Sequence, residues 1–395
     1  MSFLSWFLIS YGVLALSHIF FQMLMGHMEH RKQQTKTFKK FHTGHKAKVT
    51  VVAPVYNENP AILDKCIKSI YDQKYDDLEI IVVDDGSSNA KELDKKVYQK
   101  YNHGRLRTVM AGKHIGKRDA QKLGFDAAKG DIIVTVDSDT ILRSKNVITQ
   151  IVQRFKNPEV GAVTGDVRVA NQGKNVLTRL IGLRYWTAFH QERAAQSYFN
   201  VLMCCSGPFS AYRKEVVDNV KEKYISQTFL GKKCTFGDDR HLTNLVLEEG
   251  YKVVFDGHSR VYTFVPETLG GYIKQQVRWN KSFYREMLWT YKSFRKHHWY
   301  MMYDLTMQLV LPFMLLFALG AMVYQAIAFN DLMILWQYLA VLVGIALLRA
   351  VYGIYRTRDA GFLLFVLYGF MHVFLLIPTR LYALVTINKV RWGTR

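Results

Sequence analysis

The stretch VTVDSDT, residues 134–140, decides which fold the sequence predicts. Its run of valine and threonine is typical of a buried strand, yet the run leads into two carboxylates, Asp137 and Asp139. If the strand continues through them, both side chains point to the same face, and two neighbouring like charges cost free energy unless a cation lies between them. We therefore expect Asp137 and Asp139 to hold a metal ion.

Similar β-branched runs flank this stretch on both sides, separated by segments with helical periodicity. The runs are VTVVAPVY, EIIVVDDGS and DIIVTVDSD, and the segments between them include AILDKCIKSIYDQ and KRDAQKLGFDAAKG. This alternation predicts an α/β domain over residues 47–264 with a mostly parallel sheet. Ligands of such sheets bind beyond the carboxyl ends of the strands, so we expect the polar residues of DDGS and DSDT to share one crevice.

Several apolar runs are long enough to span a bilayer, and the 49% of hydrophobic residues is concentrated in them. The first run, residues 3–24, has no basic residue before it, whereas His30, Arg31 and Lys32 follow it. The positive-inside rule then places the amino terminus outside and the following residues in the cytoplasm. The predicted soluble domain is therefore inserted between transmembrane helices, and we expect a multi-pass protein of the plasma membrane.

After the α/β domain, apolar and basic residues repeat at helical spacing on neighbouring stripes, with Tyr284 on one and Lys281 and Arg285 on the other. This pattern favours an amphipathic helix on the cytoplasmic leaflet, and the alternative is a solvated charged face. The last apolar run, residues 361–378, has basic residues on both sides. A single crossing would place one basic group outside, so we predict a re-entrant or interfacial helix and three spans in total.

These patterns together predict an order of segments along the chain. The segments are an amino-terminal transmembrane helix (1–26), a basic cytoplasmic linker (27–46), the α/β domain (47–264), amphipathic interfacial helices (265–301), two transmembrane helices (302–350), an interfacial or re-entrant helix (351–388) and a cytoplasmic tail (389–395).

The formal net charge of +21 is compatible with nucleic acid, an anionic membrane surface or anionic substrates as partners. Nucleic acid is disfavoured, because the basic residues flank apolar runs or lie in the motifs below and no nucleic-acid-binding module is recognisable. The four cysteines show no CxxC spacing, so we expect neither a zinc site nor disulfides.

Two common nucleotide-binding motifs are absent from the sequence. No GxGxxG follows a strand, and GKHIGKR is one residue short of a P-loop and carries Arg118 where a serine or threonine should bind the metal. Four other motifs remain, which are DDGS (84–87), DSD (137–139), GDDR (237–240) and QQVRW (275–279). Each alone is typical of a turn, a helix cap or an interfacial anchor, but their joint occurrence in this order indicates a catalytic site.

In combination these motifs resemble the processive family 2 glycosyltransferases, membrane enzymes that build polysaccharides from nucleotide sugars on a GT-A fold. The resemblance is closest to the class I hyaluronan synthases, and it rests on CSGPFSAYR (205–213), QTFLGKK (227–233), GDDRHLTN (237–244), QQVRWNKSFYRE (275–286) and WGTR (392–395). Asp238 is the residue that favours this group, because chitin-type synthases carry glutamate there. The chain has one predicted amino-terminal span where bacterial members have two.

The resemblance implies a nucleotide site and a metal site. Asp85 would accept a hydrogen bond from the uracil imide N–H, and Lys117 and Arg118 would lie beside the nucleotide. Asp139, with Asp137 nearby, would hold Mg²⁺ or Mn²⁺ together with the donor diphosphate.

The remaining implied roles concern transfer and closure of the site. Asp239 would be the general base for an inverting attack, and Arg278 would neutralise the leaving diphosphate. The other implied assignments are Gln275 near the diphosphate, Trp279 and Cys205 at the acceptor sugar, and Trp392 and Arg395 in a loop that closes over the nucleotide.

The function that the resemblance implies is a hyaluronan synthase, which alternately adds GlcNAc and GlcA from UDP-GlcNAc and UDP-GlcA and passes the polymer across the membrane. The alternative is a chitin-like or poly-N-acetylglucosamine synthase that uses UDP-GlcNAc only. Arg168, Arg184 and Arg193 are the cations available to a glucuronate carboxylate. A transporter or receptor with a sugar-nucleotide sensor is a third possibility, which Asp239 and QxxRW disfavour because a sensor needs no base. Expected partners are the nascent polysaccharide and membrane lipid, with the chain as monomer or homo-oligomer.

Overall fold

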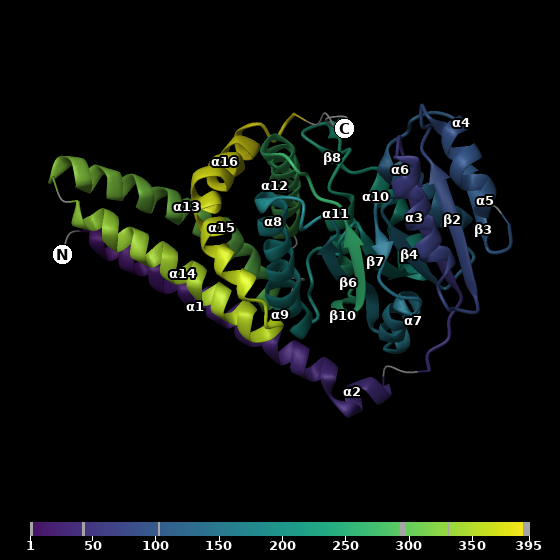
Figure 1. The fold of residues 1–395 in the computed structure, drawn as a ribbon, viewed down its shortest axis with the longest axis horizontal. Helices are drawn as coiled ribbons and strands as arrows, with labels where there is room; N and C mark the ends of the chain where they lie inside the picture. The colour runs from purple at the N-terminus through teal and green to yellow at the C-terminus, as the bar shows by residue number, and fades with distance from the viewer. Residues whose placement is uncertain (1–2, 42–43, 102, 293–297, 331, 390–395) are drawn as a thin grey trace.

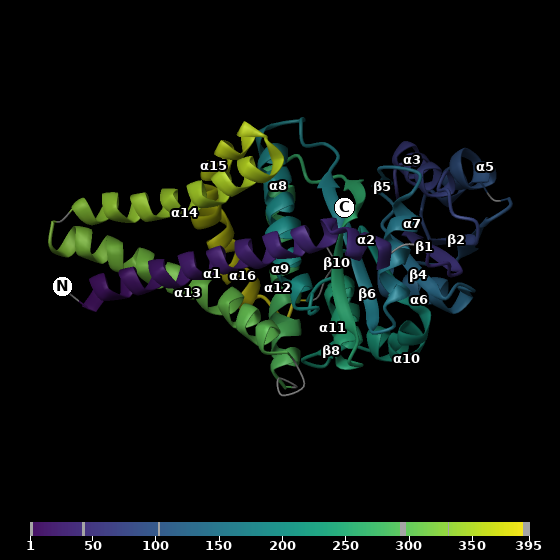
Figure 2. The same ribbon diagram turned by 90° about the horizontal axis from the view of Figure 1, so that it is seen from below.

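The computed structural model describes residues 3–41, 44–101, 103–292, 298–330 and 332–389. Figures 1 and 2 show a lobe built around one β-sheet and, beside it, a bundle of long helices to which both the start and the end of the chain contribute. The lobe is thus inserted in the chain between the long helices.

The sheet of the lobe has eight strands in the order β3-β2-β1-β4-β7-β6-β10-β5. Their bounds are β1 Val49–Val55, β2 Leu78–Asp84, β3 Leu106–Met110, β4 Ile132–Val136, β5 Ile141–Leu142, β6 Val160–Val169, β7 Phe209–Arg213 and β10 Lys252–Thr263, and a separate hairpin joins β8 Thr228–Phe229 to β9 Lys232–Lys233. Strands β1 to β4 are parallel to one another, and β6 is parallel to β10. Strand β7 runs antiparallel to β4 and β6, and β5 runs antiparallel to β10. The sheet is therefore mixed, with a parallel half that matches the predicted alternation.

The central strands β1 and β4 are buried along their whole length, which explains their unbroken apolar sequence. Helices flank the sheet and complete the lobe (Figure 1). They are α2 Lys36–Phe41, α3 Pro60–Tyr71, α4 Ala90–Leu93, η1 Asp94–Tyr98, α5 Gln99–Tyr101, α6 Lys117–Ala127, α7 Val147–Val152, η2 Gln153–Lys156, α8 Val176–Thr187, η3 Ala188–Arg193, α9 Ala194–Tyr198, α10 Lys214–Ile225, α11 Asp238–Glu248 and α12 Leu269–Lys292.

Four helical segments are long and apolar enough to cross a membrane, judged by length and composition. They are α1 (Phe3–Gln34), α13 (Trp299–Ala328), α14 (Met333–Thr357) and the segment Ala360–Val385, which consists of η5 (Ala360–Leu364), α15 (Phe365–Met371), η6 (His372–Leu376) and α16 (Ile377–Val385). The first three coincide with the predicted spans. The fourth contains residues 361–378, whose interfacial or re-entrant placement stays a prediction.

Helix α1 also contacts the lobe directly, at η3 and α9, and it crosses in front of this region in Figure 2. The contact is so close that a Cβ on Gly26 would lie 2.9 Å from the carbonyl oxygen of Gln191. The bundle and the lobe are therefore packed together rather than tethered.

The prediction of a basic stripe on the surface of α12 is wrong for two of its residues. Lys281 and Arg285 are buried, since the carboxyl-terminal half of α12 packs between α11 and α16. Arg285 donates a hydrogen bond to the carbonyl oxygen of Phe236 at 3.0 Å, and Lys281 donates to that of Lys389 at 3.2 Å. Their charges face backbone carbonyls inside the protein rather than lipid headgroups or solvent.

We predict that Gly124→Ala destabilises the lobe. A Cβ on Gly124 would lie 2.3 Å from Cγ1 of Val52, so α6 would have to move away from β1. Overpacking of this kind costs about 1–3 kcal/mol, measurable as a lower thermal unfolding temperature in detergent. The matched control is Gly173→Ala, because no atom lies within 4 Å of a Cβ at that position. Equal unfolding temperatures for the two variants would contradict the prediction.

Candidate active site

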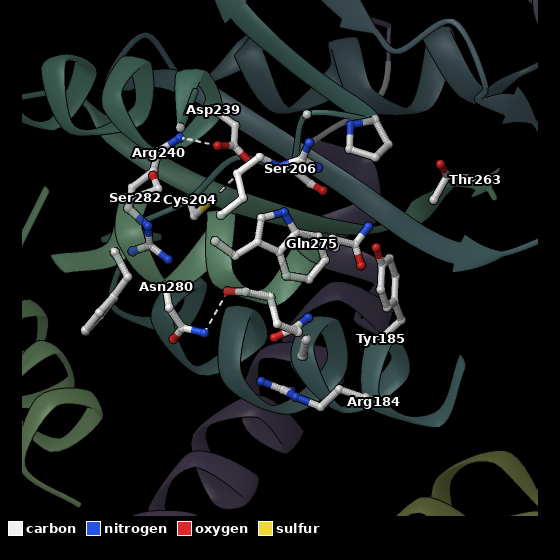
Figure 3. Close-up of a pocket in the computed structure, with 18 of the residues that line it drawn as sticks. Arg184, Tyr185, Cys204, Ser206, Asp239, Arg240, Thr263, Gln275, Asn280 and Ser282 are labelled. Carbon is white, nitrogen blue, oxygen red and sulfur yellow. Dashed lines mark hydrogen bonds between the residues drawn. The ribbon is translucent and has the colours of Figure 1, made fainter. Parts of the chain in front are cut away.

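A cavity of about 370 Å³ lies between the sheet, α8, α11 and α12. It brings together three of the four predicted motifs, although they are far apart in the sequence. Figure 3 shows Asp239 of GDDR and Gln275 of QxxRW in this cavity. Among its lining residues are Lys117, Asp137, Asp139, Cys204, Asp238, Asp239, Arg240, Gln275, Arg278 and Trp279.

The two carboxylates of the DSD motif both line this cavity, but not for the reason that strand alternation suggested. Strand β4 ends at Val136, and the chain turns at once, with the amide of Thr140 donating to the carbonyl oxygen of Asp137 at 3.0 Å. The turn, rather than the period of a strand, therefore sets where the side chains of Asp137 and Asp139 point. Asp139 accepts a hydrogen bond from the Thr263 hydroxyl at 3.2 Å.

Lys117, the first residue of α6, joins two of the motifs through its side chain. Its ammonium group lies 2.7 Å from a carboxylate oxygen of Asp137 and 3.0 Å from one of Asp238. Burial opposes the charge, but the two carboxylates outweigh it and raise the pKa of Lys117 well above its ordinary value. The cavity therefore contains a permanent cation at the point where the DSD and GDDR motifs meet.

The adjacent acids of GDDR have pKa values that are shifted in opposite directions. Burial raises the pKa of Asp239, and the negative charge of Asp238 raises it further. For Asp238, burial is outweighed by the Lys117 ammonium, so its pKa is lowered. A carboxylate with a raised pKa is better suited to accept a proton, and this supports Asp239 over Asp238 as the base.

The surroundings of Asp239 leave it accessible to a substrate. One carboxylate oxygen accepts from the Arg240 amide at 2.8 Å, and the other faces the Cys204 thiol at 3.6 Å (Figure 3). Gln275 and Tyr185 lie further along the same cavity. Asp239, Gln275 and Tyr185 therefore share one cavity.

Two arginines hold the backbone that precedes the GDDR helix. Arg118 and Arg285 donate to the same carbonyl oxygen, that of Phe236, at 3.1 and 3.0 Å. The next residue, Gly237, has φ +80° and lies so close to Ser282 that a Cβ would clash with its hydroxyl. This clamp fixes the start of α11 and hence the position of Asp239.

Arg118 was predicted to lie beside the nucleotide. It is buried and does not line the cavity, because its guanidinium is used in this clamp.

Cys205, predicted to lie at the acceptor sugar, is also buried and does not line the cavity. Its backbone amide donates a hydrogen bond to the Thr243 hydroxyl at 2.8 Å. The neighbouring Cys204 lines the cavity in its place.

Asp85 also lies outside the cavity lining. Its buried carboxylate accepts from the amides of Ile115 and Gly116 at 2.7 and 3.2 Å, and it contacts His114. Trp392 and Arg395 lie outside the described residues.

The QxxRW residues line the cavity from α12. Trp279 is 43% exposed, and its ring centroid lies 6.4 Å from that of Tyr185. Oε1 of Gln275 is buried with no hydrogen-bond partner among the described residues, so this amide has capacity to bind a substrate group.

Sequence reasoning missed two cations of the cavity. Arg240 follows the predicted base, and Arg380 reaches the cavity from α16. Arg193, which the sequence did indicate, lines the cavity and donates to the Cys204 carbonyl oxygen at 3.3 Å. Arg240 belongs to a quoted motif and could have been named. Arg380 gave no signal, because its proximity arises only when the last helical segment packs against α12.

The donor set is compatible with a divalent cation that is shared with a substrate. Asp137 and Asp139 offer hard oxygen ligands, which Mg²⁺ and Mn²⁺ prefer. Within the described ranges no group of three or more His, Cys, Asp or Glu side chains is placed to hold a metal ion. An ion bound here would therefore take its other ligands from a bound diphosphate or from water.

Comparison with known proteins agrees with this site. A family model described as glycosyltransferase like family 2 matches residues 45–282, which include the DDGS, DSD and GDDR motifs and most of α12. The chain belongs to this glycosyltransferase family. The predicted family resemblance is thereby confirmed.

The relatives of this glycosyltransferase extend over most of the chain. A hyaluronan synthase from Streptococcus pyogenes is 38% identical over 357 residues, covering 89% of this chain and 84% of the relative. An N-acetylglucosaminyltransferase from Mesorhizobium japonicum is 35% identical over 349 residues, covering 88% and 81%.

A solved mannosyltransferase from Pyrobaculum calidifontis, in complex with GDP-Man and Mn²⁺, superposes with a TM-score of 0.61 at 21% identity and covers 93% of this chain and 99% of that chain. The predicted GT-A architecture is confirmed by this fold.

We predict that Asp239→Asn lowers the rate of sugar transfer by about 10²- to 10⁴-fold, the usual contribution of a general base. UDP affinity should stay within a few fold, because the amide keeps the size of the side chain. Radiolabelled transfer and UDP titration measure the two quantities. Glu222→Gln on the surface of α10 is the control, and a transfer rate for Asp239→Asn equal to that control would exclude the base role.

We also predict that Asp238→Asn moves the acid limb of the kcat profile to lower pH. Asp239 must be unprotonated to accept a proton, so the rate falls as pH drops through its pKa. Removing the neighbouring negative charge lowers that pKa, and the fall begins at a lower pH. Asp126→Asn, on the outer face of α6, should leave the limb in place. An acid limb that stays in place or moves to higher pH in Asp238→Asn would contradict the assignment.

Proposed function

We propose that this glycosyltransferase is a hyaluronan synthase, which adds GlcNAc and GlcA in alternation from UDP-GlcNAc and UDP-GlcA. The proposal is supported by the relative of that name, which is 38% identical over 89% of the chain. It is also supported by a site that contains a base, a set of cations and a sugar-binding surface.

In the proposed reaction the acceptor sugar lies against Trp279 and Tyr185 with its hydroxyl directed to Asp239. Asp239 takes the hydroxyl proton as the oxygen attacks the anomeric carbon, and UDP leaves on the opposite face with inversion. Lys117 and Arg278 carry the positive charge that the leaving diphosphate needs. A divalent cation held by Asp139 and Asp137 would, when bound, add Lewis-acid stabilisation of that diphosphate.

A second cavity of about 270 Å³ lies among the long helices α1, α13, α14 and the segment Ala360–Val385. The residues that line it are the observation that favours an anionic polymer as the product. This cavity adjoins the active-site cavity, and the two share Arg184, Glu192, Gln308, Tyr368 and Arg380. The second cavity thus extends from the catalytic site into the helices proposed to cross the membrane, and it offers a path for the polymer.

Arginines line this path where a neutral polymer would need none. Arg184 is paired with Glu192 at 2.8 Å, but among the described residues no carboxylate forms a salt bridge with Arg349 or with Arg380, whose guanidinium donates to the Gln308 carbonyl oxygen at 2.6 Å. A polymer with a carboxylate on every second sugar would match these charges. Of the other two predicted candidates, Arg193 lines the active-site cavity, whereas Arg168 is engaged by Asp166 at 2.8 Å and lines neither cavity.

The membrane arrangement is part of the same proposal. The catalytic lobe lies in the cytoplasm, where UDP-sugars are supplied, and the polymer leaves across the plasma membrane. Arg31 and Lys32 at the carboxyl end of α1 agree with this orientation.

The test measures UDP release by the purified protein in detergent, with UDP-GlcNAc alone, UDP-GlcA alone and both together. We expect sustained turnover only with both donors, loss of turnover on chelation of divalent cations, and a product that hyaluronidase digests. Sustained polymer formation from UDP-GlcNAc alone would overturn the proposal in favour of a chitin-like synthase. The Asp239→Asn protein is the control for contaminating activity.

A further inference from the structure

Tyr56 and His114 form a stacked pair beside the predicted nucleotide site. Tyr56 directly follows β1, and His114 lies in the loop between β3 and α6. The ring centroids are 4.0 Å apart and the planes are inclined by 24°. Both side chains are exposed, at 39% for Tyr56 and 51% for the His114 side chain, so the pair lies at the protein surface rather than in the core.

Asp85 makes the second contact to His114. Its carboxylate is 3.0 Å from Nδ1 of the imidazole and is itself almost completely buried. His114 is therefore a flat ring held by an aromatic face on one side and by a carboxylate at a ring nitrogen.

A uracil ring needs the same two contacts. It has a flat face that stacks on aromatic side chains, and its imide N–H donates to a carboxylate, whereas cytosine presents an acceptor at that position. A separation of 4.0 Å between the rings of Tyr56 and His114 leaves no space for a base between them. We propose that His114 occupies the place of the uracil ring in the free enzyme and is displaced when the donor binds; this inference rests on the proposed uridine-nucleotide donor.

The loop that carries His114 is built so that it can turn at both ends. Gly112 and Gly116 have φ values of +75° and +97°, and no atom lies within 4 Å of a Cβ at either position. In the middle the loop rests on Gly86, where a Cβ would lie 2.2 Å from the carbonyl carbon of Lys113. Rotation at the two outer glycines would lift His114 from Tyr56 and break the 2.7 Å hydrogen bond from the Ile115 amide to Asp85, which would free that carboxylate oxygen for the base.

The experiment is a calorimetric titration of the full-length protein in detergent with UDP, in the absence of sugar donors. We expect His114→Ala to bind UDP about three- to tenfold more tightly than the wild type, because the base no longer has to displace a stacked ring. His114→Phe keeps a ring on Tyr56 and should bind no more tightly than the wild type. Tyr56→Ala should weaken UDP binding, since the base loses its platform.

A matched control is His103→Ala, which also removes a histidine from contact with a tyrosine ring, that of Tyr71 at 5.8 Å. It should leave UDP affinity unchanged. Weaker binding by His114→Ala would mean that the imidazole is a wall of the base site, and unchanged binding would mean that the base lies elsewhere; either result overturns this inference alone. A wild-type protein that binds no UDP would overturn the proposed donor and this inference with it.

Discussion

The ammonium group of Lys117 lies between the carboxylates of Asp137 and Asp238, and the rest of the active site depends on this arrangement. The three residues belong to the start of α6, the turn after β4 and the start of α11. Without a cation the carboxylates would repel one another in a partly buried cavity. Lys117 thus stabilises the site, and it provides a positive charge where the proposed diphosphate would bind. Its position depends in turn on the close packing of α6 against β1 at Gly124.

Helix α12 connects this site to the membrane bundle. On one side, Arg285 donates a hydrogen bond to the Phe236 carbonyl oxygen and so fixes the start of α11. Trp279 of the same helix lines the cavity. On the other side the hydroxyls of Tyr272 and Tyr368 lie 3.2 Å apart, which joins α12 to α15. Helix α12 therefore lines the proposed catalytic cavity and contacts Tyr368, a residue that lines both this cavity and the proposed path of the polymer. This arrangement gives a physical reason for the QxxRW motif to lie on a helix rather than on a loop.

Much of the site was predictable because its residue types are themselves chemically unusual. Two aspartates after a valine-rich run and adjacent aspartates before a helix indicate function when they occur together in one chain, and Asp137, Asp139 and Asp239 do line one cavity. The predictions that differ from the structure concern residues whose role depends on direction. Arg118 is turned inward to the Phe236 carbonyl oxygen, and Cys205 points away from the cavity that Cys204 lines. The direction in which a side chain points can differ between adjacent residues, and neither the composition nor a motif records it.

The sequence by itself determined the class of fold, the family and the apolar helices, because these follow from periodicity, from motif order and from hydrophobicity, which are properties of neighbouring residues. Only the tertiary structure decided which charges meet. Arg285 lies on a helix whose pattern resembles a membrane-surface helix, yet its guanidinium is buried against a backbone carbonyl 49 residues away along the chain. Arg380 reaches the catalytic cavity from the far end of the chain. Electrostatic partners are set by distances in space, and those distances exist only after the sheet, α12 and the long helices have packed together.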